Sequence, residues 1–294
     1  MFSTVKEPHT ANSVVRTDFP GLSQVKSIVA FASAKGGTGK STLATNIAAV
    51  LALKGRKVGI ADAELEAPSV APMLGVPRLR LSAANGLIEP ASGPFGIRIV
   101  ANDPTADEPP VSFADEEVQM DAGAGSDAGA SRMFASLEDL LGRTRFGALD
   151  LLLIDLPPGF RHVLRLCQLV ARAGVVMVLP ASASAATAVR RSLEKAQRKG
   201  VGVIGLIENL QGFYCGNCHS VRPLLPRADL GALARDFNVP ILGRVPFDSR
   251  LAEACDTGRS FVRDYPDAPV TKLIYEAAQA LWAAVSAPHP APRS

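Results

Sequence analysis

The chain has 294 residues, 47% of them hydrophobic, which is enough apolar material for one large domain with a substantial core. Its formal net charge of +3 is small and its basic residues are dispersed, which argues against a nucleic-acid partner. Four cysteines in this length do not make a disulfide framework, and no apolar run reaches the roughly 18 residues of a membrane span.

Short apolar strands alternate with amphipathic helices between residues 25 and 286. The predicted strands are Ser27–Ser33, Lys57–Ala61, Ile97–Ala101, Leu149–Ile154, Gly174–Leu179, Val201–Ile207 and Ile241–Val245. The predicted helices are Ser41–Leu53, Arg161–Arg172, Ser184–Lys199, Leu230–Phe237, Ser249–Asp256 and Pro269–Val285. This alternation predicts a single α/β domain, with a doubly wound, mostly parallel sheet of about seven or eight strands and helices on both faces.

Three segments fall outside this pattern. Residues 1–24 are polar and mixed, and we expect a mobile lead without a secretion signal, hence a cytoplasmic protein. Residues 102–131 are acidic and rich in Gly, Ala, Ser and Pro, and we expect a flexible insertion whose amides exchange freely. Residues 287–294 are Pro-rich, and we expect a disordered tail.

The segment Ser33–Asn46, SAKGGTGKSTLATN, joins the first predicted strand to the first predicted helix. Its glycines let backbone N–H groups turn toward an anion, and the positive end of the helix points to the same place. Lys40 can reach the β- and γ-phosphates of a nucleotide, and the Ser41 hydroxyl can bind Mg²⁺. The spacing predicts a P-loop, although Ala34 stands where the usual pattern begins with Gly.

Carboxylates follow two of the predicted strands. Asp155 ends the strand LDLLLID beside the predicted P-loop, where it can hold Mg²⁺ or its waters; the alternative is an Asp that caps the next loop. Asp62 closes the second strand, and Glu64 follows it in a candidate switch I segment, Gly59–Gly75. An ordinary P-loop has no use for a second lysine, so Lys35 is either functional or a solvated surface residue.

Cys215 and Cys218 form the one tight pair, in the stretch FYCGNCHSV that occupies residues 213–221. The pair alone fits a disulfide, a redox dithiol, half of a zinc site or half of an iron–sulfur site. A reducing cytosol disfavours the disulfide. Cys167 and Cys255 lie in apolar helical contexts and are predicted to be core residues.

Together these motifs resemble those of the Mrp family, iron–sulfur cluster carrier ATPases of the MinD/ParA-like class. The matching segments are SAKGGTGKSTLATNIAAVLALKGRKVGIADAE, APSVAPMLG, FGALDLLLIDLPPG, GLIENLQGFYCGNC and PILGRVPFDSRLAEACDTG. The resemblance runs from about Val25 to Asp264 apart from the acidic insertion. The resemblance is specific because four motifs occur in this order: the deviant Walker A motif KGGTGKS at Lys35–Ser41, then DLPPG, EN and C-x-x-C.

The resemblance implies a homodimeric P-loop ATPase that takes ATP and Mg²⁺. The residues implied in ATP binding are Lys35, Gly36, Gly37, Thr38, Gly39, Lys40, Ser41 and Thr42. Ser41 and Asp155 would serve Mg²⁺, and Lys35 would reach the nucleotide of the partner subunit. Asn209, in the EN dipeptide, would recognise adenine with its amide; the alternative is a turn Asn after a strand.

The resemblance also implies a 4Fe–4S cluster held by Cys215 and Cys218 and passed to recipient apoproteins. Since a 4Fe–4S cluster takes four thiolates and one chain offers two, a two-fold dimer would complete the set. The same four thiolates would hold tetrahedral Zn²⁺, so zinc stays the alternative metal.

The chain departs from the family pattern at three places, one of which is RPLLPRADLG, where the family has a Gly-rich segment after the C-x-x-C. Asp62 matches the first Asp of the family's catalytic D-x-D. Glu64 stands where the family has the second Asp, which is placed to orient the attacking water, and it is one methylene longer, so hydrolysis should be slow. Phe160, Arg161 and His162 replace the T-G-D that follows PPG, and we expect His162 on an exposed turn. The departures leave open a regulator with weak or no hydrolysis and a zinc-bound C-x-x-C.

A ParA- or MinD-type positioning ATPase is the other alternative. The basic helix Val189–Lys199 has an apolar face, so its charges predict a solvated surface rather than a DNA site. The C-terminal helix has a single basic residue, which argues against a membrane anchor.

Overall fold

A computed structural model describes residues 19–64, 67–76, 79, 82–84, 87–101, 137–138, 140–218, 220–224 and 229–286. The predictions for the acidic insertion, for the C-terminal tail and for most of the N-terminal lead fall outside these residues. His219, which directly follows Cys218, also lies outside them. Among the described helices, none is long and apolar enough to cross a membrane.

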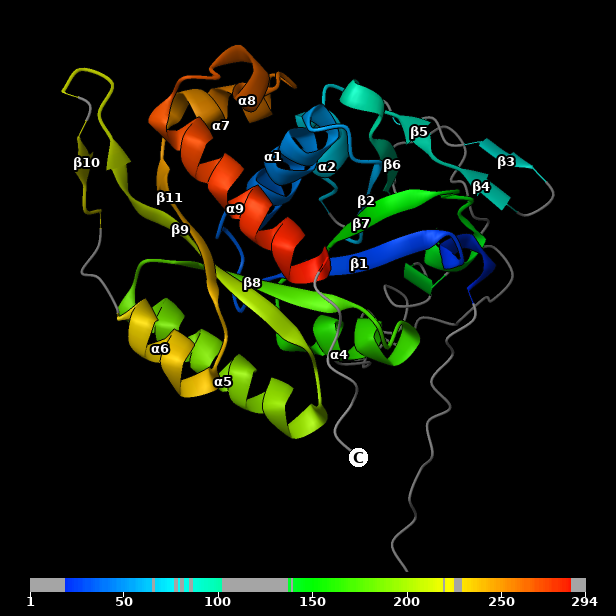
Figure 1. The fold of residues 1–294 in the computed structure, drawn as a ribbon, viewed down its shortest axis with the longest axis horizontal. Helices are drawn as coiled ribbons and strands as arrows, with labels where there is room; N and C mark the ends of the chain where they lie inside the picture. The colour runs from blue at the N-terminus through cyan, green and yellow to red at the C-terminus, as the bar shows by residue number, and fades with distance from the viewer. Residues whose placement is uncertain are drawn as a thin grey trace, which may run out of the picture.

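Nine of the described strands form one sheet (Figure 1), with the order β10-β9-β8-β1-β7-β2-β6-β5 and with β11 paired to β9. The strands are β1 (Val25–Ala32), β2 (Val58–Asp62), β5 (Ala91–Ser92), β6 (Arg98–Ala101), β7 (Leu149–Asp155), β8 (Gly174–Pro180), β9 (Val203–Tyr214), β10 (Val221–Arg222) and β11 (Ile241–Phe247). Of these strands, β5 and β10 run antiparallel to their neighbours and the others pair in parallel. A separate hairpin joins β3 (Ser82–Ala84) to β4 (Leu87–Glu89).

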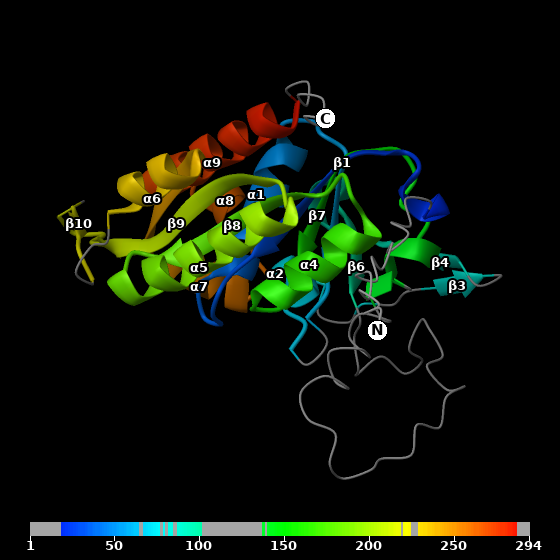
Figure 2. The ribbon, with the colours of Figure 1, turned by 90° about the horizontal axis from the view of Figure 1, so that it is seen from below.

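Helices cover both faces of the sheet, because the buried β1, β7 and β8 carry apolar side chains on each face. One face packs against α1 (Lys40–Leu53), α2 (Val70–Met73), α7 (Ser249–Asp256), α8 (Phe261–Asp264) and α9 (Pro269–Ser286). The other face packs against α4 (Phe160–Leu169), α5 (Ala183–Lys199) and α6 (Leu230–Phe237), as Figure 2 shows from below. Two short 3₁₀ turns, Pro20–Leu22 and Pro94–Gly96, complete the described elements.

The predicted doubly wound sheet is confirmed, and the predicted strands and helices all occur, most of them with shifted ends. The prediction for β9 was too short, since the strand continues from Ile207 to Tyr214. Glu208 and Asn209 end the apolar run in the sequence, yet both are buried within the strand. Glu208 forms an ion pair of 3.3 Å with Arg244 of β11. Contacts of this kind between neighbouring strands stabilise a strand that its polar sequence does not predict.

The carboxyl ends of the parallel strands meet at one edge of the sheet. The strand order reverses on either side of β1, with β7 and β2 on one side and β8 and β9 on the other. In open α/β sheets, ligands bind outside the carboxyl ends of strands at such a switch point. The loop after β1 therefore lies where the fold places a ligand.

Candidate functional site

The loop from Ser33 to Gly39 joins β1 to α1 at the switch point. Gly37 and Gly39 have φ values of +71° and +73°, a left-handed backbone that favours glycine. A Cβ on Gly39 would also collide with the side-chain amide of Asn209. The Ser33 hydroxyl donates a hydrogen bond of 2.8 Å to the Lys35 carbonyl and holds the start of the loop. The backbone therefore curls as a phosphate-binding loop requires.

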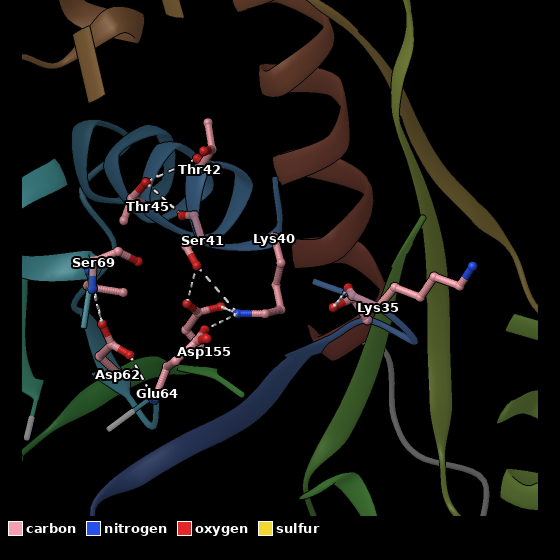
Figure 3. A network of polar contacts seen from close by, with 11 residues as sticks. Lys35, Lys40, Ser41, Thr42, Thr45, Asp62, Glu64, Ser69 and Asp155 are labelled. Carbon is pink, nitrogen blue, oxygen red and sulfur yellow. Dashed lines mark hydrogen bonds and ion pairs between the residues drawn. The ribbon is translucent and has the colours of Figure 1, made fainter. Parts of the chain in front are cut away.

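Lys40 and Ser41, the first residues of α1, converge on Asp155 at the end of β7 (Figure 3). Lys40 Nζ lies 2.5 Å from Asp155 Oδ1, and Ser41 Oγ donates to Asp155 Oδ2 at 2.5 Å. Lys40 is 6% exposed and Asp155 is fully buried. The site combines a carboxylate and a hydroxyl, which are oxygen ligands suited to Mg²⁺, with a cation suited to phosphate.

Asp62 ends β2 directly opposite Asp155, its register partner in β7. Its carboxylate accepts backbone hydrogen bonds from Glu64 at 3.0 Å, Ser69 at 2.8 Å and Val70 at 3.0 Å. Burial, and then the negative charge of Asp155, raise the pKa of Asp62 to about 6, against the opposing effect of these bonds. Two buried carboxylates side by side favour the arrival of a cation, so the pair fits Mg²⁺.

Glu64 follows Asp62 and turns toward the same cluster (Figure 3). Its Oε2 lies 4.0 Å from Lys40 Nζ, and its side chain is 32% exposed. Lys35 is exposed, and its side chain points away from Lys40 and Asp155. The structure therefore brings Lys40, Ser41, Asp62, Glu64 and Asp155 together, while Lys35 faces outward from the cluster.

The loop offers further groups to a nucleotide. Thr38 Oγ1 is buried and has no hydrogen-bond partner within the described part of the chain. A buried hydroxyl without a partner is unfavourable, and a bound ligand would remove this penalty by forming a hydrogen bond with it. Asn209 is 5% exposed and donates from Nδ2 to the Thr38 carbonyl at 2.8 Å. Asn209 lies inside β9, so the alternative of a turn Asn is wrong. Leu210, which follows it, has a φ of +54°, which bends the strand at this point.

Cys215 and Cys218 lie in the turn between β9 and β10, and we name the described residues 213–218 and 220–222 the cysteine hairpin. All four cysteines of the chain are free thiols. Cys218 is exposed, and its Sγ lies 2.9 Å from Ser220 Oγ. Hydrogen bonds from Ser220 and Cys215, and the charge of Arg222, lower the pKa of the Cys218 thiol to about 7. An accessible thiol that ionises near neutral pH suits metal binding.

The cysteine hairpin supplies only part of a metal site. Within the described residues, no three His, Cys, Asp or Glu side chains are grouped to hold a metal. Cys255 is 4% exposed and accepts a hydrogen bond from Asn46, which confirms the predicted core position. Cys167 is half-buried, and burial raises the pKa of its thiol to about 11. A metal at the hairpin therefore needs ligands beyond these two thiols.

The expectation for His162 was wrong. The side chain is 2% exposed, because His162 lies on the buried face of α4 with Leu166 and Leu169. Burial, and then the charge of Arg161, lower the pKa of His162 to about 4, so the imidazole is neutral at pH 7. The spacing i, i+4, i+7 was the signal in the sequence that pointed to burial.

Comparisons with known proteins agree with this geometry. Residues 24–120 and 127–282 match the family described as NUBPL iron-transfer P-loop NTPase, of the ParA group. An iron–sulfur cluster carrier protein of Saccharolobus solfataricus is 34% identical over 255 residues, which are 85% of this chain and 81% of the relative. The cytosolic Fe-S cluster assembly factor NUBP2 of Bos taurus is 32% identical over 88% of this chain and 94% of its own.

Solved structures share the fold. A nucleotide-binding protein of Archaeoglobus fulgidus in complex with ADP has a TM-score of 0.64 and 28% identity, over 82% of this chain and 90% of that one. The cell division ATPase MinD of Pyrococcus furiosus has a TM-score of 0.60 at 19% identity, over 87% and 98% of the two chains. The chain therefore belongs to the family of NUBPL-type iron-transfer P-loop NTPases, which includes iron–sulfur cluster carrier proteins.

Proposed function

We propose that the chain is an ATP-binding carrier that works as a homodimer, hydrolyses ATP slowly, and passes an iron–sulfur cluster to recipient apoproteins in the cytoplasm. The observation that carries the proposal is the path of β9. This strand places Asn209 on the phosphate loop and then runs on to Cys215 and Cys218, so one element links the two sites. The names of the archaeal and bovine relatives support the cargo and the compartment.

In the proposed nucleotide site, residues of this chain have distinct tasks. Lys40 neutralises the terminal phosphates, and the backbone N–H groups of the loop cradle them. Ser41 and Asp155 hold Mg²⁺, which supplies charge stabilisation to the transferring phosphoryl group. Asp62 and Glu64 orient the attacking water. Lys35, which faces outward, reaches the nucleotide of the partner subunit and makes ATP binding depend on dimer closure.

In the proposed cargo site, each chain contributes two thiolates. A two-fold axis beside the cysteine hairpin brings Cys215 and Cys218 of both subunits together, which makes the four thiolates of a 4Fe–4S cluster. The cluster is cargo rather than a resident cofactor. Because the thiols lie on an exposed turn, a rearrangement of the dimer can separate the two pairs and release the cluster.

Glu64→Asp is expected to raise the rate of ATP hydrolysis or leave it unchanged. The longer glutamate displaces the water from the position that an aspartate would give it, and a misplacement of about 1 Å can cost on the order of a hundredfold in rate. Phosphate release by the two proteins under saturating Mg²⁺–ATP measures the effect. A clear fall in the rate of the aspartate variant would show that the site is built around the longer side chain.

Asn209→Ala is expected to weaken ATP binding by about tenfold, because the variant lacks the side-chain amide that donates a hydrogen bond to the Thr38 carbonyl in the loop. If Asn209 recognises adenine, the variant also loses part of its preference for ATP over GTP. Calorimetric titration with both nucleotides separates the two effects. An equal loss of affinity for ATP and GTP would show that Asn209 supports the loop and does not recognise adenine.

The absorbance spectrum of anaerobically purified chain tests the function at least cost. We expect the broad visible absorbance of an iron–sulfur protein, with iron and sulfide found by chemical analysis. Stoichiometric zinc that iron cannot displace would instead indicate a zinc-bound nucleotide switch, because the same thiolates suit tetrahedral Zn²⁺. A chain with neither metal after anaerobic reconstitution would leave a positioning ATPase as the better account.

A further inference from the structure

We propose that Arg250 is a positioning residue that immobilises the cysteine hairpin, and that it thereby slows the release of whatever the two thiols hold. The release step rests on the proposed function. The immobilisation stands on contacts between Arg250, Asp248 and Tyr214. These three side chains belong neither to the nucleotide site nor to the metal ligands.

Arg250 is held in one orientation by Asp248. Its Nη2 donates to Asp248 Oδ2 at 2.7 Å, and its Nε donates to Asp248 Oδ1 at 3.1 Å. The Arg250 backbone N–H also donates to Asp248 Oδ1, at 3.0 Å, which caps the start of α7. Asp248 is 3% exposed. A two-point contact with a buried carboxylate fixes the plane of the guanidinium.

The fixed guanidinium faces two aromatic rings. It lies 5.7 Å from the ring centroid of Tyr214 and 5.1 Å from that of Tyr265. Tyr214 is 5% exposed, ends β9 and immediately precedes Cys215. A guanidinium within about 6 Å of a ring centroid is attracted by the face of the ring. Arg250 therefore secures the residue from which the cysteine turn begins.

A second anchor acts on the neighbouring residue of the same strand. The rings of Phe213 and Phe247 stack at 6.2 Å, and the two residues are register partners of β9 and β11. Successive side chains of a strand point to opposite faces, so Phe213 and Tyr214 secure the hairpin from both sides. Beyond them, the two exposed residues of β10 pair with Tyr214 and Phe213 and close the turn. The two anchors hold the closed turn to α7 and β11.

Arg190 offers a matched comparison within the same chain. Its Nη2 lies 2.5 Å from Asp236 Oδ2, and its guanidinium lies 5.4 Å from the ring centroid of Phe237. This group also joins an arginine to an aspartate and an aromatic ring, on α5 and α6 at the other face of the sheet, although Asp236 is half-exposed where Asp248 is buried. Its removal should not alter the cysteine hairpin.

Hydrogen exchange of the full-length apo chain tests the immobilisation. We expect the amides of residues 213–218 to exchange about tenfold faster in Arg250→Met and Tyr214→Leu than in the wild type. Arg190→Met should leave exchange in the cysteine hairpin unchanged. The effects of the two substitutions should be less than additive in the double variant Arg250→Met/Tyr214→Leu, because both remove the contact between Arg250 and Tyr214.

A purely structural role predicts a different pattern, in which exchange rises across α7, β9 and β11 together. That pattern, or a hairpin whose exchange is the same in Arg250→Met and the wild type, would overturn the proposal. If Arg250→Met does not fold, Arg250→Lys serves in its place. It keeps the charge but loses the two-point contact, so hairpin exchange should still rise.

The release step is measured on chain reconstituted with iron and sulfide. Transfer of iron to an excess of chelator should be about tenfold faster from Arg250→Met than from the wild type, and unchanged in Arg190→Met. Equal rates in Arg250→Met and the wild type would refute this step. A wild type that takes up no cluster refutes the proposed function, while hydrogen exchange still decides whether Arg250 holds the hairpin.

Discussion

Lys40→Ala is expected to abolish measurable ATP binding, with a loss of affinity of at least about a hundredfold. Lys40 Nζ is the cation that the buried site offers to the phosphates, and charge-assisted contacts of this kind contribute roughly 1.5–3 kcal/mol each. The variant also leaves Asp155 without its lysine and next to the carboxylate of Asp62, which further opposes the arrival of an anion. Calorimetric titration with Mg²⁺–ATP measures the loss.

Stability has to be followed in the same experiment. Removing one partner of a buried ion pair costs roughly 3–5 kcal/mol of folding free energy, so Lys40→Ala should also unfold at a lower temperature. Lys26→Ala is the matched control, because Lys26 also pairs with an aspartate, Asp150, at 2.7 Å, but lies 76% exposed at the other end of β1. It should bind ATP as the wild type does. Wild-type affinity in a folded Lys40→Ala would refute the assignment of the loop.

Cys215→Ser and Cys218→Ser are each expected to eliminate a stable cluster after anaerobic reconstitution. In the proposed dimer, each substitution removes two of four thiolates at once, and a serine hydroxyl is a poor replacement ligand. Iron and sulfide analysis after gel filtration measures the loss. Cys167→Ser is the control, since Cys167 is half-buried on α4, outside the cysteine hairpin.

The cysteine variants should keep their affinity for ATP, because neither thiol contacts the loop in the described structure. A cluster retained at the wild-type level in both variants would mean that the hairpin does not hold it. Loss of the cluster together with loss of ATP binding would point to a general folding defect instead.

Much of the fold could be predicted from the sequence because its signals are local. The helices α6 (Leu230–Phe237) and α7 (Ser249–Asp256) begin and end where their patterns predicted. Both follow an aspartate whose carboxylate accepts a backbone N–H of the first turn, Asp229 and Asp248. The P-loop is also a local pattern, in which glycines and the start of a helix are consecutive in the chain.

The remaining features depend on contacts between distant segments. The register that sets Asp62 opposite Asp155 is a property of β2 and β7 together. The contact of Asn209 with the Thr38 carbonyl joins segments 171 residues apart. The anchors of the cysteine hairpin come from β11 and α7, so no pattern within FYCGNC indicates them. The family resemblance gave roles to Asp62, Asp155 and Asn209, but it gave no role to Arg250.

The native mass of the anaerobically reconstituted protein decides whether two chains share one cluster. A shared site predicts a species of two chains that carries one 4Fe–4S cluster, and cluster-free protein in Cys215→Ser and Cys218→Ser. One cluster per single chain would contradict the shared site, because one hairpin offers two thiols. A dimer that carries only zinc would contradict the carrier function itself.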